Sequence, residues 1–267
     1  MKLKLCDAKS LDIVKTFECG QCFRWNANDK GVYTGVVGRY LAEVETVDNV
    51  VYITSDAPAE MWADYFDLAT DYAAVSADFT GEYLHECIDY GMGIRILRQD
   101  SWEALCSFII SQCNNITRIK GIVERLCEQF GDKCETNGVG YYTFPSAERL
   151  AALRPSDLAG IRAGYRAEYI IAAARAVTTG ELDLDALKTC DYREAIKTLR
   201  QIRGVGEKVA NCVVLFGLYH MEAFPIDVWM KRALKEHFPA DFDPTSLGAY
   251  AGLAQQYIFY YSRSGGK

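Results

Sequence analysis

The chain has 267 residues, of which 50% are hydrophobic and 24% charged, and its formal net charge at pH 7 is −7. This composition is ordinary for a globular protein and excludes collagen-like, low-complexity and disordered classes. No apolar run approaches the roughly 18 residues that a membrane-spanning helix needs, and the N-terminal segment lacks the apolar core of a secretory signal. We therefore expect a cytoplasmic protein with no signal peptide and no membrane partner.

Ten cysteines in a chain without a secretory signal indicate reduced thiols rather than disulfides. Cys19 and Cys22 form one C-x-x-C pair with no second pair nearby, and no cysteine follows Cys212. This spacing favours neither a zinc site nor an iron–sulfur cluster, so we predict no metal and no cofactor. The negative charge is uneven: residues 1–95 have a net charge of −8 and residues 96–267 of +1. A site for a polyanion is therefore expected in the second part.

The first part of the chain predicts β-structure. Four short runs rich in Val, Ile, Tyr and Thr alternate with turn-forming stretches, which favours an antiparallel meander. The predicted strands are 22–26, 32–38, 40–47 and 49–55.

From about residue 100 the apolar spacing becomes helical. Asp100 is a predicted N-cap, with Glu103 three residues later as in a capping box. Helices are expected at 102–113, 116–130, 165–177, 193–202, 208–218, 228–238 and 247–262. We predict an α+β fold in which an N-terminal antiparallel sheet domain, residues 1–95, packs on a larger helical body, residues 96–267.

A glycine turn, Gly204-Val205-Gly206, lies between two of the predicted helices. The glycines permit positive φ and leave backbone N–H groups uncovered at the start of the second helix, where an anion such as phosphate is favoured. Val205 is expected to anchor the turn in the core. Because the turn follows a helix rather than a strand, it disfavours a dinucleotide-binding fold. The pattern resembles the helix-hairpin-helix motif of base-excision-repair DNA glycosylases, which implies a hairpin that grips DNA phosphates.

Two residues near this turn are predicted to be catalytic. Lys208, two residues after the turn, is either a solvated lysine beside phosphates or a nucleophile whose neutral amine forms a Schiff base with sugar C1′. Asp227, in the segment FPIDVW, is predicted to cap the next helix, either as its only role or also as the carboxylate partner of the lysine. The pair resembles the Lys/Asp pairing of bifunctional DNA glycosylases.

Four further segments narrow the resemblance to the 8-oxoguanine DNA glycosylase family, over nearly the whole chain and in the family's order. They are CGQCFRW (19–25), IRILRQDSWEALCSFIISQCNNITRI (94–119), AGYRAEYI (163–170) and AQQYIF (254–259). The resemblance implies a pocket for a base flipped out of the duplex.

In that pocket, Cys212 and Phe259 would sandwich the base and Gln255 would pair with its Watson–Crick edge. The Gly20 carbonyl would accept a hydrogen bond from N7–H, which 8-oxoguanine has and guanine lacks. From the residues alone, a buried helix cysteine, a core aromatic and a turn glycine explain Cys212, Phe259 and Gly20 equally well.

A second group of residues is implied at the DNA. Asn114, Asn115 and Arg118 lie at a helix–helix junction, where simple polar capping is the alternative. By resemblance, this loop fills the gap left by the flipped base, and Arg118 and Arg166 hydrogen-bond the orphaned cytosine. Tyr165 would wedge beside that cytosine.

Two positions depart from the family pattern. Cys113 stands where the family commonly has the first of three asparagines, so the gap is filled by either Cys113 or Asn114. Trp229 stands where a phosphate-contacting histidine is common.

The predicted function is excision of 8-oxoguanine from duplex DNA through a lysine Schiff base, followed by β-elimination at the abasic site. The alternatives are an alkylated-base glycosylase of the same superfamily, which Lys208 disfavours, and a non-catalytic helix-hairpin-helix DNA-binding module. The expected partner is double-stranded DNA with the lesion opposite cytosine. We expect a monomer, associated with the nucleoid if the organism is prokaryotic.

Overall fold

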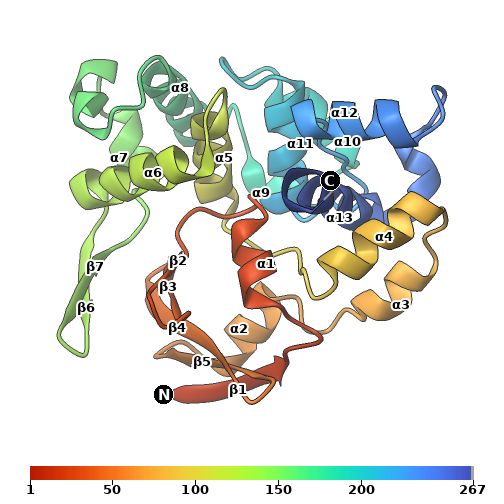
Figure 1. The fold of residues 1–267 in the computed structure, drawn as a ribbon. Helices are drawn as coiled ribbons and strands as arrows, with labels where there is room; N and C mark the ends of the chain where they lie inside the picture. The colour runs from red at the N-terminus through yellow and green to blue at the C-terminus, as the bar shows by residue number, and fades with distance from the viewer. Residues whose placement is uncertain (266–267) are drawn as a thin grey trace.

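The computed structural model describes residues 1–265 and confirms the α+β fold (Figure 1). The N-terminal sheet is antiparallel, with the strand order β1-β5-β4-β3-β2. Its strands are β1 (Lys2–Asp7), β2 (Asn26–Ala27), β3 (Tyr33–Val37), β4 (Tyr40–Val47) and β5 (Val50–Ser55). Alternate residues of β5 are buried, as expected for a sheet with one covered face.

One prediction about these strands was wrong, and one strand was not predicted. Strand β1 was missed, and the predicted strand 22–26 is mostly a loop, with β-structure only at Asn26–Ala27. The loop sends Phe23 into the core of the helical body and Trp25 into the core beneath the sheet, so it cannot keep the alternation of a regular strand. This bend brings the segment that contains Gly20 to the junction of the two cores.

Residues 56–95 and the start of the chain hold helices that the sequence analysis did not predict. These are α1 (Ile13–Glu18), α2 (Ala59–Tyr65), α3 (Tyr72–Ala77) and α4 (Glu82–Gly91). Three of them have only six or seven residues, too few to show a helical period, although Asp12 and Asp71 cap α1 and α3. Helix α4 packs against α13 of the helical body. The domain boundary at residue 95 stays a prediction.

The predicted helices of the second part are confirmed, each within four residues at either end. The helices, with two 3₁₀ segments, are α5 (Ser101–Ser111), α6 (Ile116–Phe130), α7 (Ala147–Ala151), η1 (Pro155–Ile161), α8 (Arg166–Thr178), α9 (Leu184–Leu187), α10 (Tyr192–Leu199), α11 (Glu207–Phe216), α12 (Val228–His237), η2 (Pro244–Tyr250) and α13 (Ala251–Ser264). Asp100 caps α5 as predicted, by accepting a hydrogen bond from the backbone N–H of Glu103 at 2.8 Å.

A hairpin of β6 (Lys133–Thr136) and β7 (Val139–Tyr142) projects from the body and was also missed (Figure 1). Its turn is Asn137-Gly138, and both residues have positive φ, which is the signature of a type I′ hairpin turn. None of the helices in residues 1–265 is both long and apolar enough to cross a membrane.

The buried side chain of Gln21 links the sheet domain to the start of the helical body by hydrogen bonds. Its Nε2 donates to the carbonyl of Arg95 at 2.8 Å, and its Oε1 accepts from the N–H of Leu97 at 2.9 Å. Because Gln21 follows Gly20 directly, these bonds also hold the Gly20 turn in a fixed position relative to the helices.

Candidate active site

The glycine hairpin between α10 and α11 has the geometry expected of an anion-binding turn. Gly204 has φ of +86°, and Val205 is buried, which confirms its role as the anchor. Gly206 has an ordinary φ of −89° and is the N-cap of α11, without a side chain to bond the first N–H groups. The backbone at the start of α11 is therefore open to a phosphate, since helix N-termini favour anions.

Gly204→Ala is expected to lower the free energy of unfolding by about 1–3 kcal/mol, because positive φ strains a non-glycine residue. A Cβ at this position would also lie 2.1 Å from the Tyr169 ring. Duplex binding should weaken as the hairpin moves. Gly206→Ala is the matched control, since its Cβ meets nothing within 4 Å. Equal unfolding midpoints in urea for the two variants would contradict the requirement for glycine at 204.

Lys208 lies in the first turn of α11 and is half-buried against α5. Its Nζ donates to Ser111 Oγ at 3.3 Å and lies 5.5 Å from the centroid of the Phe108 ring. Cys212 follows one helical turn later and is buried. Burial raises the pKa of the Cys212 thiol and Asp227 raises it further, whereas the Lys208 ammonium lowers it. The structure thus places the predicted nucleophile, its carboxylate partner and one wall of the predicted base pocket in one neighbourhood.

Asp227 is the N-cap of α12, as predicted. Its Oδ1 accepts hydrogen bonds from the N–H groups of Trp229 at 2.9 Å and Met230 at 3.0 Å. Within residues 1–265, Oδ2 has no hydrogen-bond partner. The cap therefore fixes the orientation of the carboxylate and leaves one oxygen available, so capping and a second role are compatible.

The predicted base pocket is assembled from the two ends of the chain. Gly20 has φ of +83°, and a Cβ built on it would lie 3.5 Å from Phe259 and 3.6 Å from both Arg263 and Ile116. Gln255 is 4% exposed, and its Oε1 is buried with no hydrogen-bond partner in the described part of the chain. An unpaired buried acceptor costs free energy in the free protein, and a ligand can satisfy it.

The loop between α5 and α6 presents Cys113 to solvent. Cys113 is exposed with φ of +48°, a region that asparagine tolerates better than cysteine. Asn114 turns back and donates to the carbonyl of Ile110 at 3.2 Å, and Asn115 caps α6 by accepting from the N–H of Arg118 at 3.0 Å. The capping interpretation is thus confirmed for both asparagines, and the Arg118 side chain is exposed.

The Arg166 side chain holds the same loop through hydrogen bonds to its backbone carbonyls. It is 4% exposed and donates to the carbonyls of Gln112 (2.9 Å from Nε), Cys113 (3.3 Å) and Ala163 (3.1 Å). Tyr165 is 51% exposed, with its ring 4.5 Å from the Arg166 guanidinium carbon. The side chains of Tyr165 and Arg118 are therefore accessible to DNA. The Arg166 guanidinium instead donates to carbonyls of the protein, and its contact with cytosine stays a prediction.

Three residues of the site were not predicted from the sequence. Ser111 accepts from Lys208, and Gln112 Nε2 donates to the carbonyl of Gly204 at 3.0 Å, which links the α5–α6 loop to the glycine hairpin. Arg263 lies against Gly20 and Phe259, two residues of the predicted base pocket. Two features of the sequence could have identified Gln112 and Arg263. Gln112 directly precedes Cys113, and Arg263 is four residues after Phe259, a spacing that puts Arg263 and Phe259 on one helix face.

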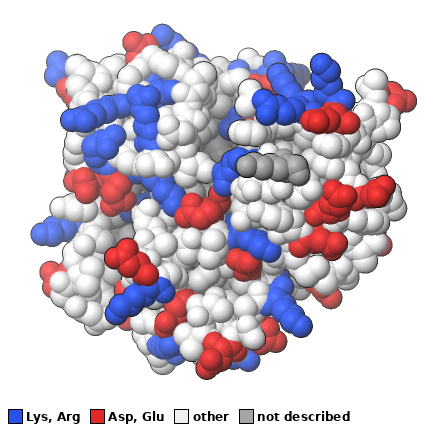
Figure 2. Space-filling view, in the orientation of Figure 1, with Lys and Arg blue, Asp and Glu red and all other residues white. Residues whose placement is uncertain are grey.

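Basic side chains gather on both sides of a hollow in the face that Figure 2 shows, over the α6–α8 region and over α12. Exposed basic residues of these two regions include Arg118, Arg162, Lys231, Arg232 and Lys235. Trp229, in the first turn of α12, is half-buried, with its ring 5.3 Å from the Arg232 guanidinium carbon. The surface flanking the site is thus locally basic although the chain is acidic, as a polyanion ligand requires.

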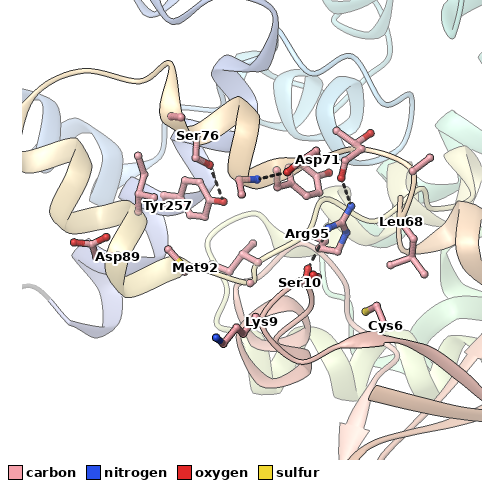
Figure 3. A pocket seen from close by; sticks show the side chains of 18 of the residues that line it. Cys6, Lys9, Ser10, Leu68, Asp71, Ser76, Asp89, Met92, Arg95 and Tyr257 are labelled. Carbon is pink, nitrogen blue, oxygen red and sulfur yellow. Dashed lines mark hydrogen bonds between the residues drawn. The ribbon is translucent and has the colours of Figure 1, made fainter. Parts of the chain in front are cut away.

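A cavity of about 920 Å³ lies elsewhere, among the β1–α1 connection, α3, α4 and α13 (Figure 3). Tyr257 borders it and bonds Ser76 with 3.3 Å between their hydroxyl oxygens. Because Tyr257 is two residues from both Gln255 and Phe259, it faces the opposite side of α13 from the base pocket. None of the predicted site residues lines this cavity.

Family models match almost the whole chain. The model described as 8-oxoguanine DNA glycosylase, N-terminal domain, matches residues 4–105. The model described as HhH-GPD superfamily base excision DNA repair protein matches residues 106–252, more than half of the chain. The chain belongs to the HhH-GPD superfamily. Its N-terminal sheet region is the domain characteristic of 8-oxoguanine DNA glycosylases, which confirms the resemblance found in the sequence.

Solved structures and curated relatives agree with this membership. The MBOgg1 structure in complex with a low-affinity DNA ligand is 39% identical, with a TM-score of 0.92 over 100% of this chain and 96% of that chain. Clostridium acetobutylicum 8-oxoguanine glycosylase/lyase, bound to double-stranded DNA with cytosine opposite 8-oxoguanine, is 34% identical, with a TM-score of 0.90 over 100% and 99% of the two chains.

Among curated relatives, Arabidopsis thaliana N-glycosylase/DNA lyase OGG1 is 29% identical over 93% of this chain and 76% of its own length. A Bacillus subtilis DNA-3-methyladenine glycosylase is 34% identical over 71% of this chain and 68% of its own length. The alkylated-base alternative thus has a relative in the same superfamily, and the site residues must decide between the two activities.

Proposed function

We propose that this HhH-GPD protein excises 8-oxoguanine from duplex DNA and then cleaves the strand at the resulting abasic site. The observation that carries the proposal is the position of Lys208, at the uncovered N-terminus of α11, where Lys208 and the oriented carboxylate of Asp227 are both close enough to the Cys212 thiol to shift its pKa. A lysine nucleophile distinguishes a glycosylase/lyase from glycosylases that activate water alone. The match to the 8-oxoguanine glycosylase N-terminal domain supports the same lesion.

The reaction follows from these groups. With the flipped nucleotide bound, the Lys208 amine forms a bond to C1′ while the bond from C1′ to the base breaks, and the base leaves with a proton that the lysine gives up. The Asp227 carboxylate stabilises the positive charge that develops on the sugar. Ring opening gives a Schiff base, loss of a C2′ proton then expels the 3′ phosphate by β-elimination, and hydrolysis releases Lys208.

A strand-cleavage assay tests the proposal. Duplexes carrying 8-oxoguanine, 3-methyladenine or an unmodified guanine are incubated with the protein, and products are separated with and without alkali. We expect cleavage without alkali on the 8-oxoguanine duplex and no cleavage at guanine. Excision of 3-methyladenine alone, with strand breaks only after alkali, would instead support the alkylated-base activity.

The opposite base should affect the rate. We expect faster excision opposite cytosine than opposite adenine, by about ten- to hundredfold, because an unmatched charged donor costs roughly 1–3 kcal/mol. Arginine only donates, and cytosine offers two acceptors on its pairing edge, whereas adenine presents a donor there. Arg118, exposed beside the gap-facing loop, is the proposed reader. Single-turnover rates opposite each base check this, and Arg118→Ala should reduce the preference; equal wild-type rates opposite C and A would contradict it.

We also propose that the protein acts as a monomer on double-stranded DNA in the cytoplasm, at the nucleoid in a prokaryote. The basic residues that flank the site support the choice of polyanion partner (Figure 2). Sedimentation of the protein with and without duplex tests the stoichiometry.

A further inference from the structure

Arg263 carries an unused hydrogen-bond donor at the edge of the base pocket. Its Nη2 donates to the backbone carbonyl of Glu18, whereas Nη1 is buried with no hydrogen-bond partner among residues 1–265. No carboxylate in that part of the chain pairs with the guanidinium. A buried cationic donor left unpaired costs free energy unless something else accepts its hydrogen bond.

The unpaired nitrogen lies against the residues predicted to hold the base. A Cβ built on Gly20 would lie 3.6 Å from Arg263 Nη1 and 3.5 Å from Phe259 Cε1, so both side chains lie against Gly20. The guanidinium carbon is 5.5 Å from the centroid of the Phe259 ring. Gln255, Phe259 and Arg263 are spaced four residues apart, which places them along one face of α13.

Two buried polar atoms without partners therefore belong to this face, the Gln255 Oε1 acceptor and the Arg263 Nη1 donor. A free protein rarely leaves such atoms unsatisfied, and their occurrence on one helix face beside Gly20 indicates a polar ligand. An 8-oxopurine offers hydrogen-bond acceptors for Nη1. Its N7–H is flanked by the carbonyl oxygens O6 and O8, so a donor beside Gly20 can meet an acceptor next to the N7–H group.

We propose that Arg263 is a specificity-determining residue of the base pocket, which holds the Gly20 turn through Glu18 and donates from Nη1 to a carbonyl oxygen flanking N7 of the flipped base. The inference rests on the proposed excision of 8-oxoguanine and adds a residue to it. It also gives a reason for the arginine near the end of α13: one guanidinium nitrogen fixes the acceptor for N7–H, and the other contacts the base itself.

The test compares two substrates that differ only in the base. Single-turnover rates are measured for Arg263→Met on an 8-oxoguanine duplex and on a duplex with a preformed abasic site. We expect excision to slow by about 10- to 100-fold, the scale of a lost charge-assisted hydrogen bond, and cleavage of the abasic site to change by less than about twofold. Gln255→Leu should likewise slow excision and leave cleavage of the abasic site nearly unchanged. Lys2→Met, which removes an exposed ion pair with Glu45 in the sheet domain, should change neither rate.

Equal losses on both substrates would overturn the proposal, because a phosphate contact or a general scaffold role does not depend on the base. Unchanged rates on both would overturn it as well. If Arg263→Met melts at a lower temperature than the wild type, Arg263→Lys provides the same comparison, since it keeps one cationic donor for Glu18 and loses the second nitrogen. Failure of the proposed function is a separate result, in which the wild-type protein does not excise 8-oxoguanine at all.

Discussion

Replacing Lys208 with glutamine is expected to abolish base excision and strand cleavage, by about 10⁴-fold or more, the scale of removing a covalent nucleophile. Glutamine keeps much of the length and polarity of lysine, but its amide nitrogen cannot form a Schiff base. The side chain still reaches toward Ser111, so the packing of α11 against α5 should persist. Single-turnover assays on an 8-oxoguanine duplex measure the loss, and duplex binding, which depends on the hairpin backbone, should remain.

Borohydride trapping separates a nucleophile from a lysine that only binds phosphate. The wild-type protein should form a covalent complex with the lesion duplex in the presence of borohydride, and Lys208→Gln should form none. Lys188→Gln is the matched control, because it removes an exposed lysine whose ammonium already pairs with Asp185 at 2.7 Å. Trapping of Lys208→Gln at the wild-type yield would assign the Schiff base to another residue.

The sequence predicts the helical body better than the sheet region, for a physical reason. Long helices such as 116–130 bury a stripe with a period of 3.6 residues, and that period is visible without tertiary information. Helices of four to seven residues show no period, and the segment 22–26 divides its apolar side chains between two cores. The Asn137-Gly138 turn, by contrast, was a readable signal for the missed hairpin.

The candidate site likewise divides into features that the sequence predicts and features that it does not. The geometry of the Gly204 turn and the Asp227 cap depends on local backbone chemistry, so both could be predicted from neighbouring residues. The contact of Gly20 with Phe259 and Arg263 joins the two ends of the chain, and only the family resemblance pointed to part of it. The orientation of Arg166 toward the carbonyls of Gln112 and Cys113 could not be predicted, because an arginine beside a DNA-facing loop can point either way.

Replacing Asp227 with asparagine should slow excision by about 10²- to 10³-fold, the scale of removing a preorganised charge from a transition state. Asparagine is as good an N-cap as aspartate, so its side-chain oxygen can keep the bonds to Trp229 and Met230 while the negative charge is lost. The melting temperature should therefore change little. Asp227→Ala removes charge and cap together and should add about 1 kcal/mol of destabilisation to the same loss of rate.

The comparison of these variants distinguishes the two roles of Asp227. Asp183→Asn is the matched control, because Asp183 caps α9 through the N–H groups of Asp185 and Ala186, and its replacement should leave excision unchanged. A capping role alone predicts that Asp227→Asn excises 8-oxoguanine at a near-normal rate and that only Asp227→Ala is impaired, in proportion to its lost stability. A charge role predicts that both variants are slow while only the alanine variant is unstable. Because Oδ1 accepts the capping hydrogen bonds and Oδ2 has no hydrogen-bond partner within residues 1–265, the structure favours the second pattern.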